Sequence, residues 1–256
     1  MAYYDHLLLQ QDLEAQQTYD DLPRSLTDGH LFCVWKYETR DGKPTKVPYS
    51  PTNYGSTSTR AKSSDPATFA DFETARNYFN AYPFDGMGIG FFGNLVGIDI
   101  DHCIDKNVGT ISPLAMRIAT TINSYTEISP SGDGLHIILE VTSGFRDGMT
   151  ATDERGRSSY KARYFNKNSP QAPGVEVYIA GETNRFFTLT GKQIDLGNGG
   201  IVRERTAQLR GILDEYMRRP EQAAEMLVVA AGGSPQVWSN GPGTGRRVSV
   251  VPVGPW

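Results

Sequence analysis

The sequence predicts an α+β domain in which mixed or antiparallel sheets are flanked by helices. Strand-like and helix-like patterns follow one another in irregular order, without the strict alternation that builds a parallel sheet. Neighbouring strand-like segments are joined by short turns containing glycine, which is typical of antiparallel pairs. The composition, with 38% hydrophobic and 21% charged residues, is ordinary for a globular protein.

The first half of the chain is expected to contain a strand, a helix and a hairpin. Residues 31–38 predict a strand, and a loop rich in Gly, Pro, Ser and Thr follows it. Asp65 stands directly before a proline, as at a helix N-terminus, and a phenylalanine stripe at helical spacing predicts one helix over 65–82. Segments 86–92 and 96–101 are separated by a short glycine turn and predict a hairpin.

The second half predicts two helices and two further strand pairs. The expected elements, in order, are a helix that begins at Ser112-Pro113, strands over 126–129 and 135–141, strands over 175–180 and 186–191, and a helix over 203–219. Between them, residues 142–174 are polar and basic without a clear periodicity. A stretch of this length is typical of a functional or irregular loop.

The bulk properties exclude several classes of protein. Two cysteines, Cys33 and Cys103, without a Cys-x-x-Cys motif argue against a disulfide framework and against a zinc ribbon. No apolar run is long enough to span a membrane, and the N-terminus lacks a secretory signal pattern. We therefore expect a cytoplasmic protein without a membrane partner. The net charge of −4 still permits nucleic-acid binding, because only the binding groove must be basic.

Two acidic residues interrupt the apolar segment 96–101, VGIDID. Asp99 and Asp101 stand at i and i+2, so in a strand they point to the same face, roughly 6.6 Å apart along the chain. Carboxylates among apolar neighbours repel each other and lose hydration, and a divalent cation between them removes both costs. The pair therefore indicates a metal site, with a solvated strand end as the alternative.

A glycine turn at 129–136, SPSGDGLH, predicts a cradle for phosphate. Gly132 and Gly134 allow a tight turn with inward-pointing backbone N–H groups, and Ser131 adds a hydroxyl donor. His136 follows where the next strand begins, and an imidazole N–H there could hold a triphosphate. The alternative is a glycine turn followed by a hydrogen-bonded structural histidine.

Other residues fit the same chemistry. Glu176, in the strand-like VEVY, is either a solvated strand residue or a third metal ligand that converges with the two aspartates. Lys46 and Arg185 could neutralise triphosphate or template phosphates. Three aromatic residues are candidates either for stacking on bases or for core packing: Tyr49, Phe186 and Phe187.

The order of these motifs resembles a known family. The segments KVPYSP, GMGIGFF, VGIDIDHCID, SYTEISPSGDGLHI, VEVYIAG and RFFTLTG follow one another as in the primase-polymerase (prim-pol) domains of phage and plasmid replication proteins, members of the archaeo-eukaryotic primase superfamily. The resemblance spans about residues 31–195. Each motif is short, but their order and spacing together are specific.

The resemblance implies a role for each matching position. Asp99 and Asp101 fall on the hydrophobic-Asp-hydrophobic-Asp motif of metal ligands, and Glu176 on the third acidic position. Ser131 and His136 fall on the Ser…His motif that contacts the phosphates of the incoming nucleotide. The matching basic positions are Lys46, in the KVPY-like segment, and Arg185, before the FT-like strand.

The resemblance also implies a domain organisation, cofactors and partners. It divides the chain into a polar extension (1–25), a prim-pol catalytic domain (26–200), a C-terminal helical segment (201–231) and a Gly/Pro-rich tail or linker (232–256). Two Mg²⁺ or Mn²⁺ ions are the expected cofactors, with NTPs or dNTPs as substrates. A single-stranded DNA template is the expected partner, and relatives often continue into a helicase.

Two features depart from the family pattern. Asp133 places a negative charge in the turn that is expected to meet phosphates, and the basic segment 142–174 is long for this family. Its cations, together with those of 203–219, are candidates for template binding, above all Arg155, Arg157, Lys161 and Arg163. Two other functions stay open at this point, a metal-dependent nuclease and a non-catalytic DNA-binding module for replication initiation.

Overall fold

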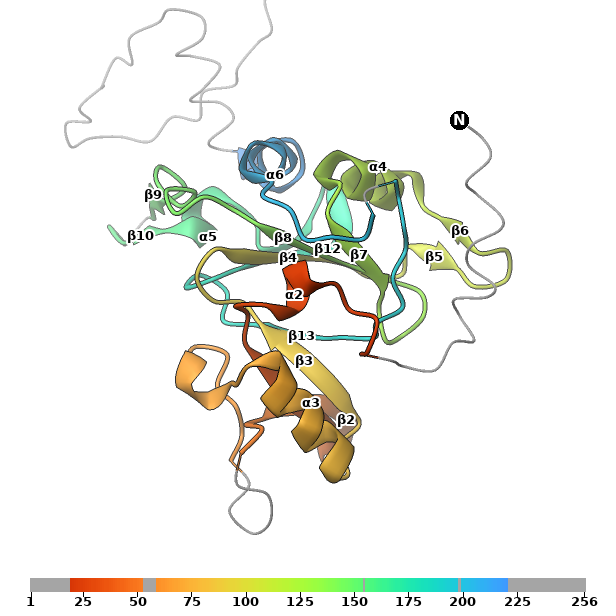
Figure 1. The fold of residues 1–256 in the computed structure, drawn as a ribbon. Coiled ribbons are helices and arrows are strands. Elements are labelled where there is room, and N and C mark those ends of the chain that lie inside the picture. Colours follow the sequence, from red (N-terminus) through yellow and green to blue (C-terminus); the bar gives the residue numbers. More distant parts are fainter. Residues whose placement is uncertain (1–18, 53–58, 154, 198, 221–256) are drawn as a thin grey trace, which may run out of the picture. The chain divides into compact units, whose positions relative to one another are not determined.

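The computed structural model in Figure 1 describes residues 19–52, 59–153, 155–197 and 199–220. The chain divides into two units between Arg219 and Pro220, and everything below concerns the first unit. Residues 1–18 of the expected N-terminal extension, 221–231 of the expected helical segment and the whole expected tail, 232–256, lie outside the described residues. Within the described part of the first unit, two antiparallel sheets form the framework, which agrees with the expected α+β class.

One sheet has four strands. Its members, in spatial order, are β13 (Phe186–Thr188), β3 (Gly86–Gly90), β1 (Phe32–Arg40) and β2 (Lys43–Tyr49). Helix α3 (Phe72–Ala81) packs on β1 and β3, where the rings of Phe32 and Phe72 meet edge to face, with centroids 5.3 Å apart. β3 is buried along its whole length, because α3 packs on it and its Met87 and Ile89 share a buried cluster with residues of the other sheet.

The other sheet has five strands. Its members, in spatial order, are β11 (Lys167–Ser169), β12 (Ala172–Ile179), β4 (Leu95–Ile100), β8 (Leu135–Glu140) and β7 (Tyr125–Ile128). Helices α4 (Pro113–Ile122) and α6 (Thr206–Ile212) cover one face, and their isoleucines share a buried cluster with Ile98 and Ile137 (Figure 1). The opposite face packs on the four-stranded sheet, because Leu95 and Ile138 share a cluster with Met87.

Short elements complete the described chain. They are α2 (Arg24–Thr27), the 3₁₀ turn η1 (Pro66–Thr68), the hairpin β5 (Ile104–Asp105) with β6 (Thr110–Ile111), the hairpin β9 (Ala151–Thr152) with β10 (Ser158–Ser159), α5 (Tyr160–Arg163) and the π-helical turn η2 (Leu213–Met217). No helix in the described ranges is long and apolar enough to cross a membrane. Cys33 and Cys103 are both buried free thiols.

Two expected strand pairs are wrong. β3 and β4 follow each other in the chain but belong to different sheets, and the same holds for β12 and β13. β3 already pairs with β1 on one side and with β13 on the other, so no edge is left for β4. Each short connection therefore carries the chain from one sheet to the other. The third expected pair, β7 with β8, is confirmed.

The helix starts are partly as expected. Ser112 caps α4, since its hydroxyl accepts the Ala115 N–H (3.3 Å). Asp65 caps only the 3₁₀ turn η1, and α3 has its own cap at Asp71, whose carboxylate accepts the Thr74 N–H at 2.9 Å. The single helix expected over 65–82 is therefore wrong, because the backbone is extended at Phe69 between the two elements.

The segment 142–174 is more ordered than an irregular loop. It contains β9, β10, α5 and β11, and its large side chains are buried in the core beneath α6 and η2. Those buried residues are Phe145, Met149, Tyr160 and Tyr164. These residues form two separate i, i+4 pairs, which are too short to predict an element, so the sequence did not show that they anchor the segment.

Candidate functional site

A row of ionisable side chains crosses the five-stranded sheet. Glu176 on β12 pairs with Asp99 on β4, Asp99 pairs with His136 on β8, and His136 pairs with Glu127 on β7. Residues directly opposite in an antiparallel ladder point to the same face. We call these four residues the polar row. The row lies on the face that packs against the four-stranded sheet, whereas Ile98 and Ile100 point to the helices.

Asp99 is the central carboxylate of the row. Its side chain is 16% exposed, and Oδ1 is buried without a hydrogen-bond partner. Burial raises the pKa of Asp99, and the nearby charges of Asp101 and Glu176 raise it further, against the opposing charge of His136. An unpartnered buried oxygen in a group of acids is a costly arrangement that a cation would relieve.

Tyr178 connects two acids of the row. Its hydroxyl lies 3.3 Å from Asp99 Oδ2 and 3.3 Å from Glu176 Oε2. Burial raises the pKa of Tyr178, and the charges of Asp99 and Glu176 add to that effect, so the hydroxyl stays a donor. Asp101, beyond the end of β4, is exposed, and its N–H donates to Gly174 O at 2.9 Å. The structure therefore brings the three predicted acids together, with Asp101 at the solvent side.

Two predicted cations lie beside these acids. Lys46 reaches from β2 of the other sheet, with Nζ 3.3 Å from Thr188 Oγ1. Burial lowers the pKa of Lys46, and the negative charges of Asp99 and Asp101 oppose that shift. Arg185 is exposed just before β13, and its positive charge acts on Tyr178. Lys46 and the acids thus face each other between the two sheets.

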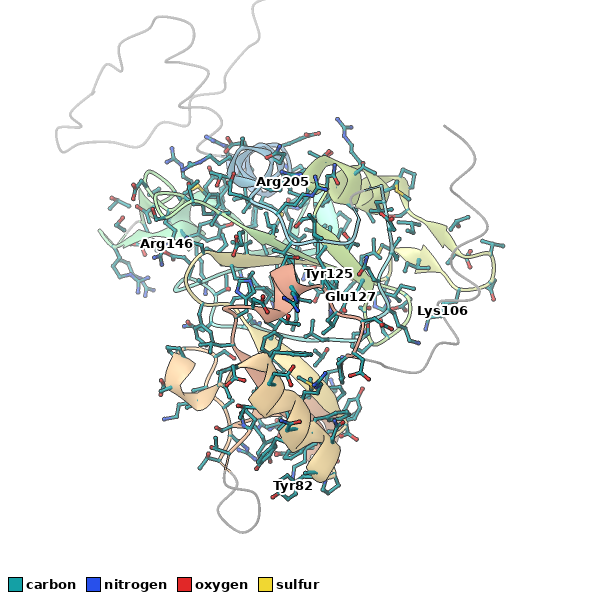
Figure 2. The ribbon with its side chains drawn as sticks, in the orientation of Figure 1. Tyr82, Lys106, Tyr125, Glu127, Arg146 and Arg205 are labelled. Carbon is teal, nitrogen blue, oxygen red and sulfur yellow. The ribbon has the colours of Figure 1, made fainter. Side chains whose placement is uncertain are left out.

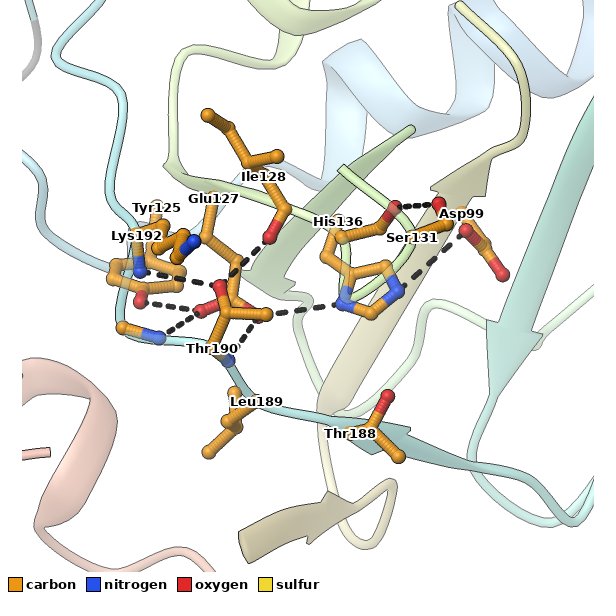
Figure 3. Close-up of polar contacts among 12 residues, drawn as sticks. Asp99, Tyr125, Glu127, Ile128, Ser131, His136, Thr188, Leu189, Thr190 and Lys192 are labelled. Atoms are coloured by element: carbon orange, nitrogen blue, oxygen red, sulfur yellow. Dashed lines mark hydrogen bonds and ion pairs between the residues drawn. The ribbon is translucent and has the colours of Figure 1, made fainter. Parts of the chain in front are cut away.

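His136 is buried between two acids of the row (Figure 3). Nδ1 lies 3.3 Å from Glu127 Oε1, and Nε2 lies 3.7 Å from Asp99 Oδ1. The ring of Phe187, from the four-stranded sheet, stacks on the imidazole with centroids 4.2 Å apart and an angle of 6°. His136 is therefore a hydrogen-bonded, packed histidine that also borders the acid site, and its phosphate contact stays a prediction.

The glycine turn is closed by its own hydrogen bonds. The Gly132 N–H donates to Ser129 O (2.9 Å), and φ at Gly132 is +77°, a conformation that favours glycine. A Cβ on Gly134 would lie 2.8 Å from Ile100 O, so glycine is needed for close approach. Asp133 accepts from the Ser131 hydroxyl, and that hydrogen bond is the main reason why the pKa of Asp133 is lowered.

Two further residues contact the turn that contains Asp133. His102 Nδ1 lies 3.0 Å from the second carboxylate oxygen of Asp133, and Lys106 Nζ donates to Ser131 O at 2.7 Å. The acid thus belongs to a local network that holds the turn. In this arrangement the Ser131 hydroxyl is directed to Asp133, so a phosphate would have to compete for it.

Glu127 is a buried acid that we did not single out from the sequence. It is fully buried, and its carboxylate accepts from the Tyr125 hydroxyl (2.9 Å), the Thr190 N–H (3.1 Å) and the Gly191 N–H (3.0 Å). In Figure 2, Glu127 and Tyr125 are labelled in the interior, whereas Tyr82 and Lys106 lie at the periphery. Its signal in the sequence is weak, because one acid in a four-residue strand is ordinarily solvated.

The other predicted contacts divide into two groups. Tyr49 and Phe187 are buried in the core, and Phe186 is half-buried against Cys33 and Phe69, so for these rings the core interpretation fits the structure. Of the predicted template-binding cations, Arg155, Arg157 and Lys161 are exposed and Arg163 is half-buried, and two of the four also contact their own segment. Arg157 pairs with Asp153, and Arg163 donates to Gly148 O.

Whether the acids of this site could hold a divalent metal depends on the oxygen atoms that they offer as ligands. No group of three His, Cys, Asp or Glu side chains in the described ranges is arranged as a metal site. Mg²⁺, however, is commonly held by one or two carboxylates, with water and substrate phosphates as the other ligands. Asp99, with its unpartnered Oδ1, and Glu176 supply two hard oxygen donors joined by one hydroxyl. These two residues fit such a metal, with Asp101 next to them.

Comparison with known proteins gives one clear relation. No family model matches this chain. A curated relative, described as a DNA Primase-polymerase of Nitratiruptor phage NrS-1, is 32% identical over 166 residues, 64% of this chain. The match covers 19% of the relative, so the chain spans about a fifth of that protein's length. The matched part of this chain is therefore homologous to part of a phage primase-polymerase, which confirms the resemblance to prim-pol domains that its motifs indicated.

Proposed function

We propose that this chain carries out template-directed nucleotidyl transfer as a DNA primase-polymerase in phage or plasmid replication. The observation that carries the proposal is the pairing of Asp99 with Glu176 on adjacent strands, with Asp101 beside them and Lys46 across from them. Acids opposite a cation are what a nucleotide triphosphate with its divalent ions requires. The similarity to the phage primase-polymerase supports the same function.

Each residue has a proposed task. Asp99, Glu176 and Asp101 would hold Mg²⁺ or Mn²⁺, which when bound supplies a Lewis acid for the attacking hydroxyl and the leaving pyrophosphate. The bond that forms joins the 3′-oxygen to the α-phosphorus, and the bond that breaks joins that phosphorus to the pyrophosphate oxygen. Lys46 and Arg185 offer positive charge to the phosphates, which lowers the repulsion between triphosphate and acids.

The remaining predicted residues would orient the substrates. Ser131, His136 and the turn at Gly132 and Gly134 would position the triphosphate, which is mainly an effect of orientation. Four cations of the segment 142–174 would contact the backbone of a single-stranded DNA template: Arg155, Arg157, Lys161 and Arg163. A replicative helicase is a proposed partner, and the cytoplasm of a host cell is the proposed location.

A primer-extension experiment tests the proposal. The full chain is incubated with a primed single-stranded template, Mg²⁺ or Mn²⁺, and labelled dNTPs or NTPs. We expect extension by the wild type and none by Asp99→Ala or Asp101→Ala. Glu215→Gln is the matched control, because this acid lies on the surface in an ion pair with Arg117. Repeating the reaction without primer then tests priming.

Three outcomes would contradict the proposal. Wild-type extension by Asp99→Ala would mean that the acids are not the catalytic site. Shortening of labelled DNA without nucleotides would instead identify a nuclease, and DNA binding without extension would identify a non-catalytic module.

A further inference from the structure

Glu127 lies in the interior, one strand away from the proposed metal ligands. It is fully buried, yet both carboxylate oxygens are engaged (Figure 3). Oε2 accepts from the Tyr125 hydroxyl and the Gly191 N–H. Oε1 accepts from the Thr190 N–H and lies 3.3 Å from His136 Nδ1. A buried carboxylate with this many donors is well satisfied and rigidly held.

The donor and acceptor roles in the contact between Glu127 and His136 depend on which ring nitrogen carries a proton. The oxygens of Glu127 act as acceptors toward two backbone N–H groups and a hydroxyl, so Oε1 also acts as an acceptor toward Nδ1. His136 Nδ1 must then carry a hydrogen. The partner of one ring nitrogen sets the role of the other nitrogen, which here is Nε2.

A second constraint holds the plane of the same ring. Phe187 stacks on the imidazole nearly in parallel, with an angle of 6° between the rings. Phe187 therefore fixes the plane of the ring, and Glu127 fixes its rotation within that plane. Together they turn Nε2 toward Asp99, whose Oδ1 is buried without a hydrogen-bond partner at 3.7 Å.

We propose that Glu127 is the positioning residue of this site, which fixes the tautomer and rotation of His136 so that Nε2 faces Asp99 and the triphosphate of an incoming nucleotide. The part of this proposal that concerns the nucleotide rests on the proposed function. Buried acids that orient a histidine in this way are common behind metal and catalytic sites. Glu127 itself does not touch the substrate.

A purely structural role for Glu127 is the competing explanation. Its carboxylate also clamps the segment after β13, where Thr190 and Gly191 donate to it and where the chain crosses from the four-stranded sheet to β7. Thr190 and His136 share Oε1, and Gly191 and Tyr125 share Oε2, so the two roles are separated through Tyr125, which contacts the carboxylate and not the histidine. Tyr125 donates only to Oε2, whereas His136 lies against Oε1. Tyr125→Phe therefore weakens the clamp without removing the contact to the histidine.

The first measurement is made on the wild-type chain, with one variant used for assignment. Nitrogen-15 NMR of the His136 imidazole, assigned by its loss in His136→Gln, reports which ring nitrogen carries a proton. We expect a protonated Nδ1 in the full chain without metal. A bare Nδ1 with a protonated Nε2 would overturn the proposal, because Glu127 would then have no hydrogen to accept. This result is decisive even if Glu127→Gln or Tyr125→Phe fails to fold.

The second measurement compares Glu127→Gln with Tyr125→Phe. The glutamine amide loosens the hold on Nδ1, so we expect mixed His136 tautomers and a kcat/KM for nucleotide lower by about 10- to 100-fold, mostly through KM. Tyr125→Phe should lower the melting temperature but keep the wild-type tautomer and kcat/KM. Equal kinetic losses in both variants would overturn the proposal in favour of the clamp.

The proposed function can fail separately from this inference. A wild type that extends no primer but shows a protonated Nδ1 would refute the polymerase assignment and would support the geometry assigned to Glu127. An active wild type whose Glu127→Gln variant keeps one tautomer and full kcat/KM would support the polymerase assignment and overturn the positioning role.

Discussion

The two faces of the five-stranded sheet differ sharply in chemistry. Toward α4 and α6, strand β4 presents Val96, Ile98 and Ile100, all buried among other apolar side chains. Toward the four-stranded sheet, the same strand presents Leu95, which is buried among apolar side chains, and then Gly97 and Asp99. The first face stabilises the fold by burying apolar surface, and the second holds charges that burial disfavours. Adjacent residues of one strand thus serve stability and chemistry separately, and substitutions can test that separation.

The largest expected effect is on activity, in Asp99→Asn. We expect kcat/KM to fall at least about a hundredfold, since a metal site supplies several kcal/mol and about 1.4 kcal/mol is a factor of ten. The extension assay with a primed template measures this loss.

The same variant should be more stable without metal. Because the pKa of Asp99 is raised in the folded state, its stabilising protonated form is lost as pH rises through that pKa. Asparagine cannot ionise, so at neutral pH with EDTA we expect a gain of about 0.5–2 kcal/mol in the free energy of unfolding. Urea unfolding measures it, and Asp101→Asn, at an exposed site, should show no comparable gain. A less stable Asp99→Asn would contradict the comparison of the two faces.

Ile98, next to Asp99 on β4, should have the opposite effects, with a loss of stability and no loss of activity. Ile98 is fully buried against the helices, so Ile98→Ala should lower the free energy of unfolding by about 2–5 kcal/mol through lost burial and a cavity. The kcat/KM of the folded protein should stay at the wild-type value, measured well below the melting temperature. A catalytic loss at such temperatures would show that the two faces are coupled.

Gly97 tests how tightly side chains pack on the face of the five-stranded sheet that carries Asp99. An added Cβ would lie 2.3 Å from the Phe91 ring and 2.7 Å from the Phe187 ring, so Gly97→Ala should cost about 1–3 kcal/mol by overpacking. Gly211→Ala is the control, because no atom lies within 4 Å of its added Cβ in helix α6. That control should gain about 0.5–1 kcal/mol. Denaturant unfolding of both variants should therefore give shifts of opposite sign.

The smallest expected effect lies outside the five-stranded sheet, at the cap of α3. Asp71→Ala should cost about 1 kcal/mol, because the Thr74 N–H loses its acceptor. The pKa of Asp71 is lowered by that hydrogen bond, so the contribution is present above the unfolded pKa and is lost as pH falls through the folded one. Urea unfolding at neutral pH and below pH of about 3.9 should show the difference shrink. A catalytic effect would be unexpected.

Local chemistry could be predicted where one short segment contains its whole cause. Ser112 caps α4 as its position before a proline indicated, and the glycine turn joins β7 to β8 as expected. Asp99 and Asp101 could be recognised because acids at i and i+2 in an apolar strand are chemically unusual. The sequence could not show that β3 and β4, or β12 and β13, belong to different sheets. A short turn permits a hairpin but does not determine which sheet each strand joins.

The sequence by itself predicted most strands of the two sheets, the cap of α4 and the acids of the site, because periodicity, caps and buried charge are local properties. It did not predict β2 or β11, which lie in the expected loops 40–64 and 142–174. Tertiary structure alone decided that Glu176, Asp99, His136 and Glu127 share one row, because strand register joins residues far apart in the chain. It also decided that Glu127 is fully buried and tied to His136. Burial depends on what packs above a residue, and here the covering residues come from the other sheet and the segment after β13.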